Sequence, residues 1–141
     1  MTCLTLTHQN RASFTASLHA QSWIMACLCA DWCNTCKSYQ SLFAALALRF
    51  PEVQLVWIDI EDQADVVGDL DIENFPTILI QQGHQVLFFG TMLPEIQLAE
   101  RLLQSKLSAS GEERIMQAEL LLRQRLGQGE CDIWHLLQNI D

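Results

Sequence analysis

The chain has little positive charge. Its 141 residues contain 8 Lys and Arg against 17 Asp and Glu, which gives a formal net charge of −9, and no Lys or Arg lies between Arg49 and Arg101. Proteins that bind nucleic acid or anionic membranes concentrate basic residues on one face. We therefore expect neither a nucleic-acid partner nor a membrane. The acidic residues crowd residues 59–73, which predicts a solvated acidic face or, alternatively, a surface that favours basic partners.

Long apolar runs are also missing. The longest run, around residues 23–30, is far shorter than the roughly 20 residues that a transmembrane helix needs. The first eight residues lack the basic start and the apolar core of a signal peptide. We therefore expect a cytoplasmic protein. Because structural disulfides are rare in that compartment, six cysteines indicate one redox pair plus buried or free thiols rather than a disulfide framework.

The apolar pattern predicts an α/β fold. Half of the residues are hydrophobic, which is enough for a folded core. Strands are expected over 3–6, 23–29, 53–60, 78–80 and 85–89, and helices over 13–20, 38–50, 62–71 and 95–107. Strands that alternate with helices and end in a hairpin predict a mixed central sheet flanked by helices.

Two further helices are expected over 112–126 and 132–140. We therefore divide the chain into a domain of residues 1–107 and a C-terminal helical extension of residues 108–141. Each extension helix has an apolar stripe that something must cover. The sequence leaves two alternatives open. The extension packs back on the domain, or it forms a surface for a homodimer or a partner protein.

Cys33 and Cys36 form a Cys-x-x-Cys motif between the strand over 23–29 and the helix that follows it. The free N–H groups and the dipole at a helix N-terminus stabilise an anion, which favours the thiolate of Cys33. Cys36 lies one turn further on the same helix face and can close a disulfide with Cys33. An exposed nucleophile beside a shielded resolving thiol indicates a redox site.

Over about residues 3–107 the sequence resembles the thioredoxin family. The resemblance is carried by Trp32-Cys33-Asn34-Thr35-Cys36-Lys37, by Phe75-Pro76-Thr77, by Asp59 at a strand end and by Gly90 after the hairpin. In that family the proline that matches Pro76 is cis, and its loop faces the cysteine pair. The resemblance implies a three-layer thioredoxin-like fold. It also implies a substrate groove lined by Trp32, Phe75, Pro76, Thr77 and Gly90.

Two departures from the family lie beneath the site. The family commonly buries an acid six residues before the first cysteine, with a lysine near it, and the matching positions are Cys27 and Trp57. Losing both is physically coherent, because losing one would leave an unpaired buried charge. No carboxylate then stands ready to deprotonate Cys36. We therefore expect mixed disulfides to be released more slowly than in a typical thioredoxin.

The resemblance implies a thiol–disulfide oxidoreductase that acts on protein disulfides through Cys33 as nucleophile and Cys36 as resolving thiol. It implies no cofactor beyond the redox-active Cys33–Cys36 disulfide, and a thioredoxin reductase or a small thiol as the reductant. The alternative is a protein-binding adapter with weak redox activity that docks through residues 108–141. Zinc or an iron–sulfur cluster on the cysteines is disfavoured, because Cys27 and Cys29 lie on a strand expected to be buried.

Overall fold

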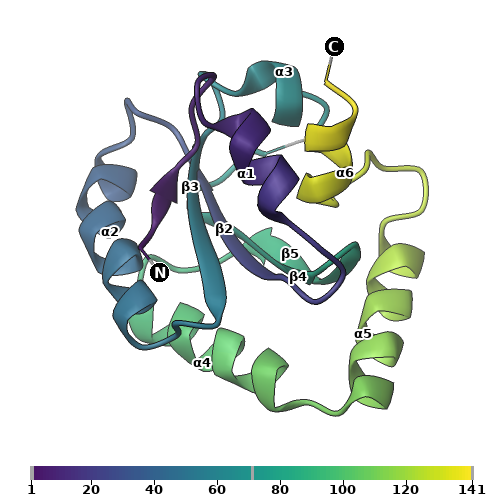
Figure 1. Cartoon of the computed structure of the whole chain (residues 1–141). Coiled ribbons are helices and arrows are strands. Elements are labelled where there is room, and N and C mark those ends of the chain that lie inside the picture. The colour runs from purple at the N-terminus through teal and green to yellow at the C-terminus, as the bar shows by residue number, and fades with distance from the viewer. Residues whose placement is uncertain (1, 71, 141) are drawn as a thin grey trace.

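A computed structural model describes residues 2–70 and 72–140 of the chain, which fold around one five-stranded sheet (Figure 1). The strands are β1 (Leu4–Thr5), β2 (Trp23–Cys29), β3 (Val53–Asp59), β4 (Thr77–Gln82) and β5 (Gln85–Thr91), in the order β1-β3-β2-β4-β5. β3 pairs in parallel with both β1 and β2, whereas β4 runs antiparallel to β2 and to β5. The predicted mixed sheet is confirmed.

Helices cover both faces of this sheet, as Figure 1 shows. They are α1 (Arg11–Ser17), α2 (Asn34–Ala45), α3 (Ala64–Val67), α4 (Ile96–Ser108), α5 (Gly111–Gln124) and α6 (Ile133–Gln138). Because side chains alternate along a strand, β2 contributes to two cores. Cys27 and Cys29 pack with α2 and α4 on one face, while Ala26 and Leu28 pack with α1, α3 and α6 on the other. The predicted three-layer arrangement is confirmed.

Several element boundaries differ from the expected ones. The helix predicted over 38–50 begins earlier, at Asn34, and ends in a 3-10 turn over Leu46–Leu48. Apolar periodicity misses its start because the first turn is polar. The helix predicted over 62–71 is only the single turn α3, and residue 71 lies outside the described residues. The strand predicted over 78–80 extends to Gln82, because Gln81 and Gln82 continue the ladder with β2.

The C-terminal extension crosses the edge of the sheet. It starts beyond α4, α5 lies along the edge strand β5, and α6 contacts α1 and α3 on the opposite face (Figure 1). Ile133 and Leu137 of α6 are buried there. Of the two alternatives for the extension, packing back on the domain therefore holds for α6. The division of the chain at residues 107 and 108 stays a prediction.

A buried polar network fastens α6 to the β4–β5 hairpin. The amide of Gln81, which is fully buried, donates to Asp132 Oδ1 (2.8 Å) and accepts from the Ile133 N–H (3.0 Å). The second oxygen of Asp132 lies 2.7 Å from His84 Nδ1. The His84 ring stacks on Trp134 with ring centroids 4.0 Å apart. These contacts fix the start of α6 on the sheet.

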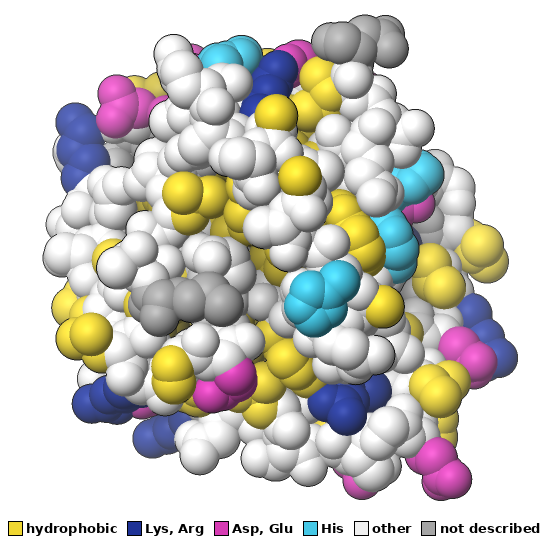
Figure 2. All heavy atoms as spheres, in the orientation of Figure 1, with side chains coloured by type: hydrophobic (Ala, Val, Ile, Leu, Met, Phe, Trp, Pro, Cys, Tyr) yellow, Lys and Arg dark blue, Asp and Glu magenta, His cyan; other side chains and the backbone are white. Residues whose placement is uncertain are grey.

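The surface of α5 differs from that of α6. Figure 2 shows hydrophobic, basic and acidic side chains alternating over the side where α5 lies. The large hydrophobic side chains exposed on or just after α5 are Ile115, Met116, Leu120, Leu122 and Leu126. They are half to four-fifths exposed, so this helix keeps uncovered apolar side chains. Within the part of the chain that the structure describes, no helix is long and apolar enough to cross a membrane.

Candidate active site

The two motif cysteines lie at the junction of β2 and α2. β2 ends at Cys29, and a short turn closes when the Cys33 N–H donates to the Ala30 carbonyl (3.0 Å). Cys33 is the N-cap of α2, where its carbonyl accepts from the Lys37 N–H (3.1 Å). Its side chain is partly exposed, whereas Cys36 in the first turn is only 1% exposed. The motif therefore presents one accessible and one shielded sulfur.

The disulfide in this structure joins Cys29 to Cys36, with Cα atoms 5.8 Å apart, and Cys33 is a free thiol. This differs from the Cys33–Cys36 disulfide expected from the sequence. The reason is the pleat of β2, which turns Cys27 and Cys29 toward α2, where Cys36 points into the same core. Cys27 Sγ lies 4.0 Å from Cys29 Sγ. Five cysteines thus pack on this core, because Cys3 and Cys33 lie against the cluster that contains Cys27, Cys29 and Cys36.

The two altered positions beneath the site are apolar. Cys27 is fully buried and Trp57 is 7% exposed. Burial, and to a lesser extent the nearby Cys3, raises the pKa of the Cys27 thiol well above its usual range. Cys27 therefore stays protonated at neutral pH and cannot serve as the base that a carboxylate would supply. Among the described residues, Asp132 is the only buried charged side chain, and it lies at the start of α6, on the other side of the sheet.

Tyr39 places a hydroxyl in the same core. Its side chain is 1% exposed, and within the described part of the chain the hydroxyl has no hydrogen-bond partner. Burial and the proximity of Cys27 raise the pKa of Tyr39 above its ordinary value, so the group remains a donor at neutral pH. An unused donor is unusual in a protein interior, where buried polar groups are normally paired.

The loop before β4 lies beside the motif. The Phe75–Pro76 peptide bond is cis, as the resemblance implied. The Phe75 ring meets the Trp32 ring edge-on with centroids 5.6 Å apart, and Trp32 is 65% exposed. The Trp32 indole N–H donates to the Glu61 carboxylate. The Pro76 carbonyl already accepts from the Met92 N–H (3.1 Å), so that acceptor is shared with the protein's own backbone.

Thr77 and Gly90, the other two expected groove residues, lie slightly apart from the cysteines. Thr77 is 3% exposed, and its hydroxyl donates to the Asn74 carbonyl (2.8 Å). Both residues line a hollow whose far wall is formed by Arg125 and Gln128 of the extension. The structure therefore brings Trp32, Phe75 and Pro76 to the cysteine motif, whereas Thr77 and Gly90 also face the extension.

A family model for thioredoxin matches residues 5–103 of this chain. The chain belongs to the thioredoxin family. The match covers β1 to α4 and therefore includes the motif, the loop at Pro76 and Gly90. The helices α5 and α6 lie outside it.

Individual thioredoxins align over a shorter region. Thioredoxin H5 of Oryza sativa subsp. japonica is 29% identical over 56 residues, which are 40% of this chain and 42% of that protein. An H-type thioredoxin of Picea mariana is 34% identical over 58 residues, which are 40% of this chain and 46% of that protein. The chain thus spans less than half the length of these curated relatives.

Solved structures show the same fold over a longer stretch. The thioredoxin NaTrxh of Nicotiana alata superposes with a TM-score of 0.63 at 20% identity, covering 73% of this chain and 90% of that one. A chain from the crystal structure of ferredoxin:thioredoxin reductase in complex with thioredoxin f2 superposes with a TM-score of 0.63 at 14% identity, covering 76% and 96%. At this identity the likeness establishes the thioredoxin fold alone.

Sequence reasoning missed three residues at this thioredoxin site. The sequence indicates Cys29 only as a buried thiol, although its spacing of two residues from Cys27 on a strand already places both sulfur atoms on one face of the sheet. Glu61, one of many acidic residues in its segment, had no signal that it would reach Trp32. Arg125 reaches the Thr77 hollow through the fold of the extension, which no local pattern reveals. Across the described residues, no group of three or more His, Cys, Asp or Glu side chains is arranged to hold a metal ion.

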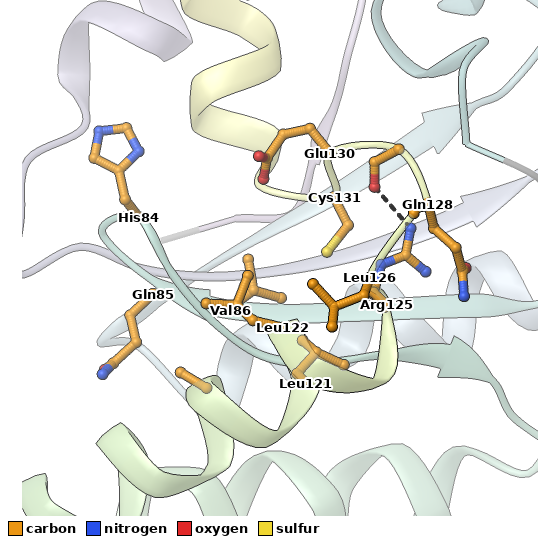
Figure 3. Close-up of a pocket in the computed structure, with 13 residues that line it drawn as sticks. His84, Gln85, Val86, Leu121, Leu122, Arg125, Leu126, Gln128, Glu130 and Cys131 are labelled. Carbon is orange, nitrogen blue, oxygen red and sulfur yellow. Dashed lines mark hydrogen bonds between the residues drawn. The ribbon is translucent and has the colours of Figure 1, made fainter.

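A separate apolar cavity of about 400 Å³ lies between α5, the segment after it and the hairpin. Figure 3 shows Val86, Leu121 and Leu122 around it, with the Cys131 thiol at one side. The Arg125 guanidinium at its rim donates to the Gly129 carbonyl (2.9 Å). The hairpin pairs with the start of β2, about 20 Å along the strand from Cys29. The residues that line this cavity lie outside the cysteine motif, but Arg125 and Gln128 also line the hollow at Thr77 and Gly90, so the two adjoin.

Proposed function

We propose that this protein is a thiol–disulfide oxidoreductase in which Cys33 attacks the disulfide of a protein substrate. The observation that supports this proposal most directly is a partly exposed free thiol at the N-cap of α2, next to the exposed Trp32 and the loop at Phe75 and Pro76. A helix N-terminus stabilises the thiolate that attacks and later leaves.

The proposed reaction has two exchange steps. The Cys33 thiolate attacks one sulfur of the substrate disulfide, forms a mixed disulfide and releases the other substrate sulfur as a thiolate. Cys36 then attacks Cys33 Sγ, releases the second substrate thiol and leaves a Cys33–Cys36 disulfide. Cys36 can do this only when its bond to Cys29 is reduced. Two cysteines carry the electrons, so the reaction requires no further cofactor.

The second step is expected to be slow. Cys36 is buried, and Cys27, which stands where the family commonly has an acid, remains a protonated thiol at neutral pH. A buried thiol without a base seldom reaches its thiolate, because burial disfavours the charged form. We therefore propose that mixed disulfides live longer on this protein than on thioredoxins that have a buried acid at this position.

The substrates are proposed to be neutral or basic proteins. Glu61 contacts Trp32 at the proposed groove, and Asp59 lies at the end of β3 beside it, where its carboxylate accepts the Glu61 N–H (2.9 Å). This negative charge attracts basic chains and repels acidic ones, and salt screens both effects. Added salt should therefore slow turnover of a basic disulfide substrate and speed turnover of an acidic one. Equal responses would contradict the proposal.

Trapping of the mixed disulfide tests the function. The variant Cys36→Ser, mixed with insulin, should retain insulin on Cys33 through a bond that dithiothreitol releases, as intact-protein mass spectrometry would show. The double variant Cys33→Ser and Cys36→Ser is the matched control and should retain nothing. A Cys36→Ser protein that is folded and remains unmodified would contradict the proposal, and so would equal trapping by the control.

The reductant is proposed to be a thioredoxin reductase or a small thiol, in a reducing compartment such as the cytoplasm. A thioredoxin f2 has been crystallised with ferredoxin:thioredoxin reductase, and a chain of that crystal structure shares this fold. The same proposal places no nucleic acid or membrane among the partners.

The second candidate function is an adapter with weak redox activity. The observation that favours it is the uncovered apolar side chains of α5, where Met116 and Leu122 are about two-thirds exposed. Such side chains suit a homodimer or another protein. In that case the trapping variant would yield only non-covalent partners or dimers, and substitution of Met116 by Lys would abolish them.

A further inference from the structure

We propose that Cys36 changes its disulfide partner, from Cys33 at the surface to Cys29 in the core, and that Cys29 is therefore a third redox-active cysteine. The inference rests on the proposed function in one respect, because oxidation has to enter through Cys33. It goes beyond the two-cysteine reaction by giving the oxidised protein a second, buried form in which Cys33 is again a free thiol.

The geometry places Cys36 between two possible partners. Its bond to Cys29 is present in the structure, with Cα atoms 5.8 Å apart, a separation that disulfides commonly have. Cys33 is the N-cap of α2, three residues before Cys36, which is the spacing of a Cys-x-x-Cys pair at the start of a helix. Cys29, Cys33 and Cys36 all pack on the same core cluster. Cys36 can therefore bond in either direction without a change of fold.

The exchange step is balanced without an outside oxidant. The Cys29 thiolate attacks Cys36 Sγ, the Cys29–Cys36 bond forms, and the Cys33–Cys36 bond breaks. Cys33 leaves as a thiolate and takes up the proton that Cys29 lost, directly or through solvent. One disulfide is present before and after the step, so no electrons are gained or lost.

The exchange favours release of Cys33. A thiol leaves faster when its thiolate is stabilised, and the N-terminus of α2 supplies that stabilisation to Cys33. Cys29 and Cys36 are each 1% exposed, so their bond forms in an apolar core that suits a neutral disulfide better than a thiolate.

The consequence is a change in the chemistry that the surface presents. The Cys29–Cys36 bond is closed to the thiol of a large reductant, because both sulfur-bearing residues are buried. Cys33, by contrast, can still form a mixed disulfide, and Cys36 is no longer free to resolve it. The oxidised protein therefore acts as a single-thiol protein until the exchange reverses.

The sequence allows a direct test on the unmodified protein. A protease that cleaves before aspartate separates Cys29 from Cys33 and Cys36, because it cuts at Asp31 and next at Asp59, and residues 1–30 contain no acidic residue. Reduced protein is oxidised with excess insulin, quenched in acid, alkylated and digested. We expect residues 1–30 and 31–58 to remain joined by a disulfide, with the alkyl group on Cys33. Separate fragments with Cys33 protected would overturn the proposal.

Variants identify the partner and the entry point. Cys29→Ser should separate the two fragments, whereas the matched control Cys27→Ser, at the neighbouring buried sulfur, should leave them joined. A bond that survives Cys29→Ser and disappears in Cys27→Ser would overturn the assignment to Cys29. Cys33→Ser treated with insulin should stay reduced, and joined fragments in that variant would overturn entry through Cys33.

The same experiment separates this inference from the proposed function. If the wild-type protein reduces insulin but its fragments separate, the proposed function stands and the proposed change of disulfide partner is wrong. Wild-type protein that fails to reduce insulin with dithiothreitol as the reductant contradicts the function itself. A mild chemical disulfide such as oxidised glutathione, used in place of insulin, then still reports whether Cys29 and Cys36 pair.

Discussion

The two faces of the sheet treat buried polar groups in opposite ways. On the α2 face, where the family places an acid and a lysine, the chain has Cys27 and Trp57, which are both buried. On the other face, Gln81 and Asp132 are buried and bonded to each other. Beneath the cysteines, where we propose redox chemistry, the described residues include no buried charged side chain. On the other face, where we propose no chemistry, the charged residue Asp132 is buried.

The difference shows what each region requires. A buried charge is stable only when partners satisfy it, and Asp132 has Gln81, His84 and the start of α6. That network specifies one docking position for the extension. Beneath the cysteines, the loss of both charged partners leaves an apolar pocket that suits disulfides, at the expense of a base for Cys36. Hydrogen bonds between buried polar groups therefore fix the position of the extension. At the redox site, burial among apolar side chains stabilises the disulfide.

Removing the polar anchor is expected to have the largest effect. Gln81→Leu leaves the Ile133 N–H and the Gly83 carbonyl without the partner that they have in the structure, and it removes one of the two donors to Asp132 Oδ1, which keeps the His135 N–H. Each buried unsatisfied group costs about 1–3 kcal/mol, so the free energy of unfolding should fall by about 3 kcal/mol or more. Urea denaturation measures this. The control Gln82→Leu, at the next residue of β4, should cost less than about 0.5 kcal/mol, and equal losses would contradict the role of the network.

Restoring an acid beneath the site is expected to have the next largest effect. Cys27→Asp should lower the free energy of unfolding by about 2 kcal/mol at pH 7, because a buried carboxyl without a cation is disfavoured. Burial raises the folded-state pKa of such a carboxyl, so the folded state keeps a proton that the unfolded state loses. The loss of stability should therefore grow as the pH rises above about 4.

The isosteric variant Cys27→Asn is the control for this change. It has no titrating group, so its stability relative to the wild type should not follow that pH dependence. The Asp variant should also release a Cys33 mixed disulfide faster than the Asn variant in a single-turnover assay. Equal release rates from two folded proteins would contradict the role assigned to the missing acid.

A smaller effect is expected where α5 meets the sheet. Leu121 packs with the α6-side core and lines the cavity of Figure 3, whereas Leu120 is 54% exposed. Leu121→Ala should lower the free energy of unfolding by about 1 kcal/mol, below the cost for a fully buried leucine. Leu120→Ala should change it by only a few tenths. Thermal denaturation of the two variants compares them, and a larger loss for Leu120→Ala would show that α5 docks by its other face.

The smallest effect is a pH dependence of the reduced protein. Burial raises the pKa of Cys3 from 9.0 to about 11, and burial raises that of Cys27 as well. The folded state then keeps protons that the unfolded state releases, so stability is complete below about pH 9 and falls as the pH rises toward 11. Cys3→Ala should make the decline in melting temperature between pH 9 and 10 shallower. An identical decline would contradict the burial of this thiol.

The sequence predicted the parts of the structure that depend on local pattern. β2 and the motif at the start of α2 follow from an apolar run, a Cys-x-x-Cys spacing and the amphipathic helix after it. The sequence did not predict that Cys36 bonds to Cys29, or that Gln81 and Asp132 anchor α6. Cys29 reaches Cys36 because the pleat of β2 turns its side chain toward α2. The sequence predicts Gln81 as a turn residue, because its buried partner, Asp132, lies 51 residues away. Long-range pairing of polar groups has no local signature.

The most direct test of the account is the rate of insulin reduction with dithiothreitol as the reductant, measured for the wild type and for Cys33→Ser at equal concentration. The account predicts turnover above background for the wild type and the background rate for Cys33→Ser, because the free thiol at the α2 N-cap makes the first attack. Turnover by a folded Cys33→Ser protein at the wild-type rate would contradict the assignment of Cys33 as the nucleophile.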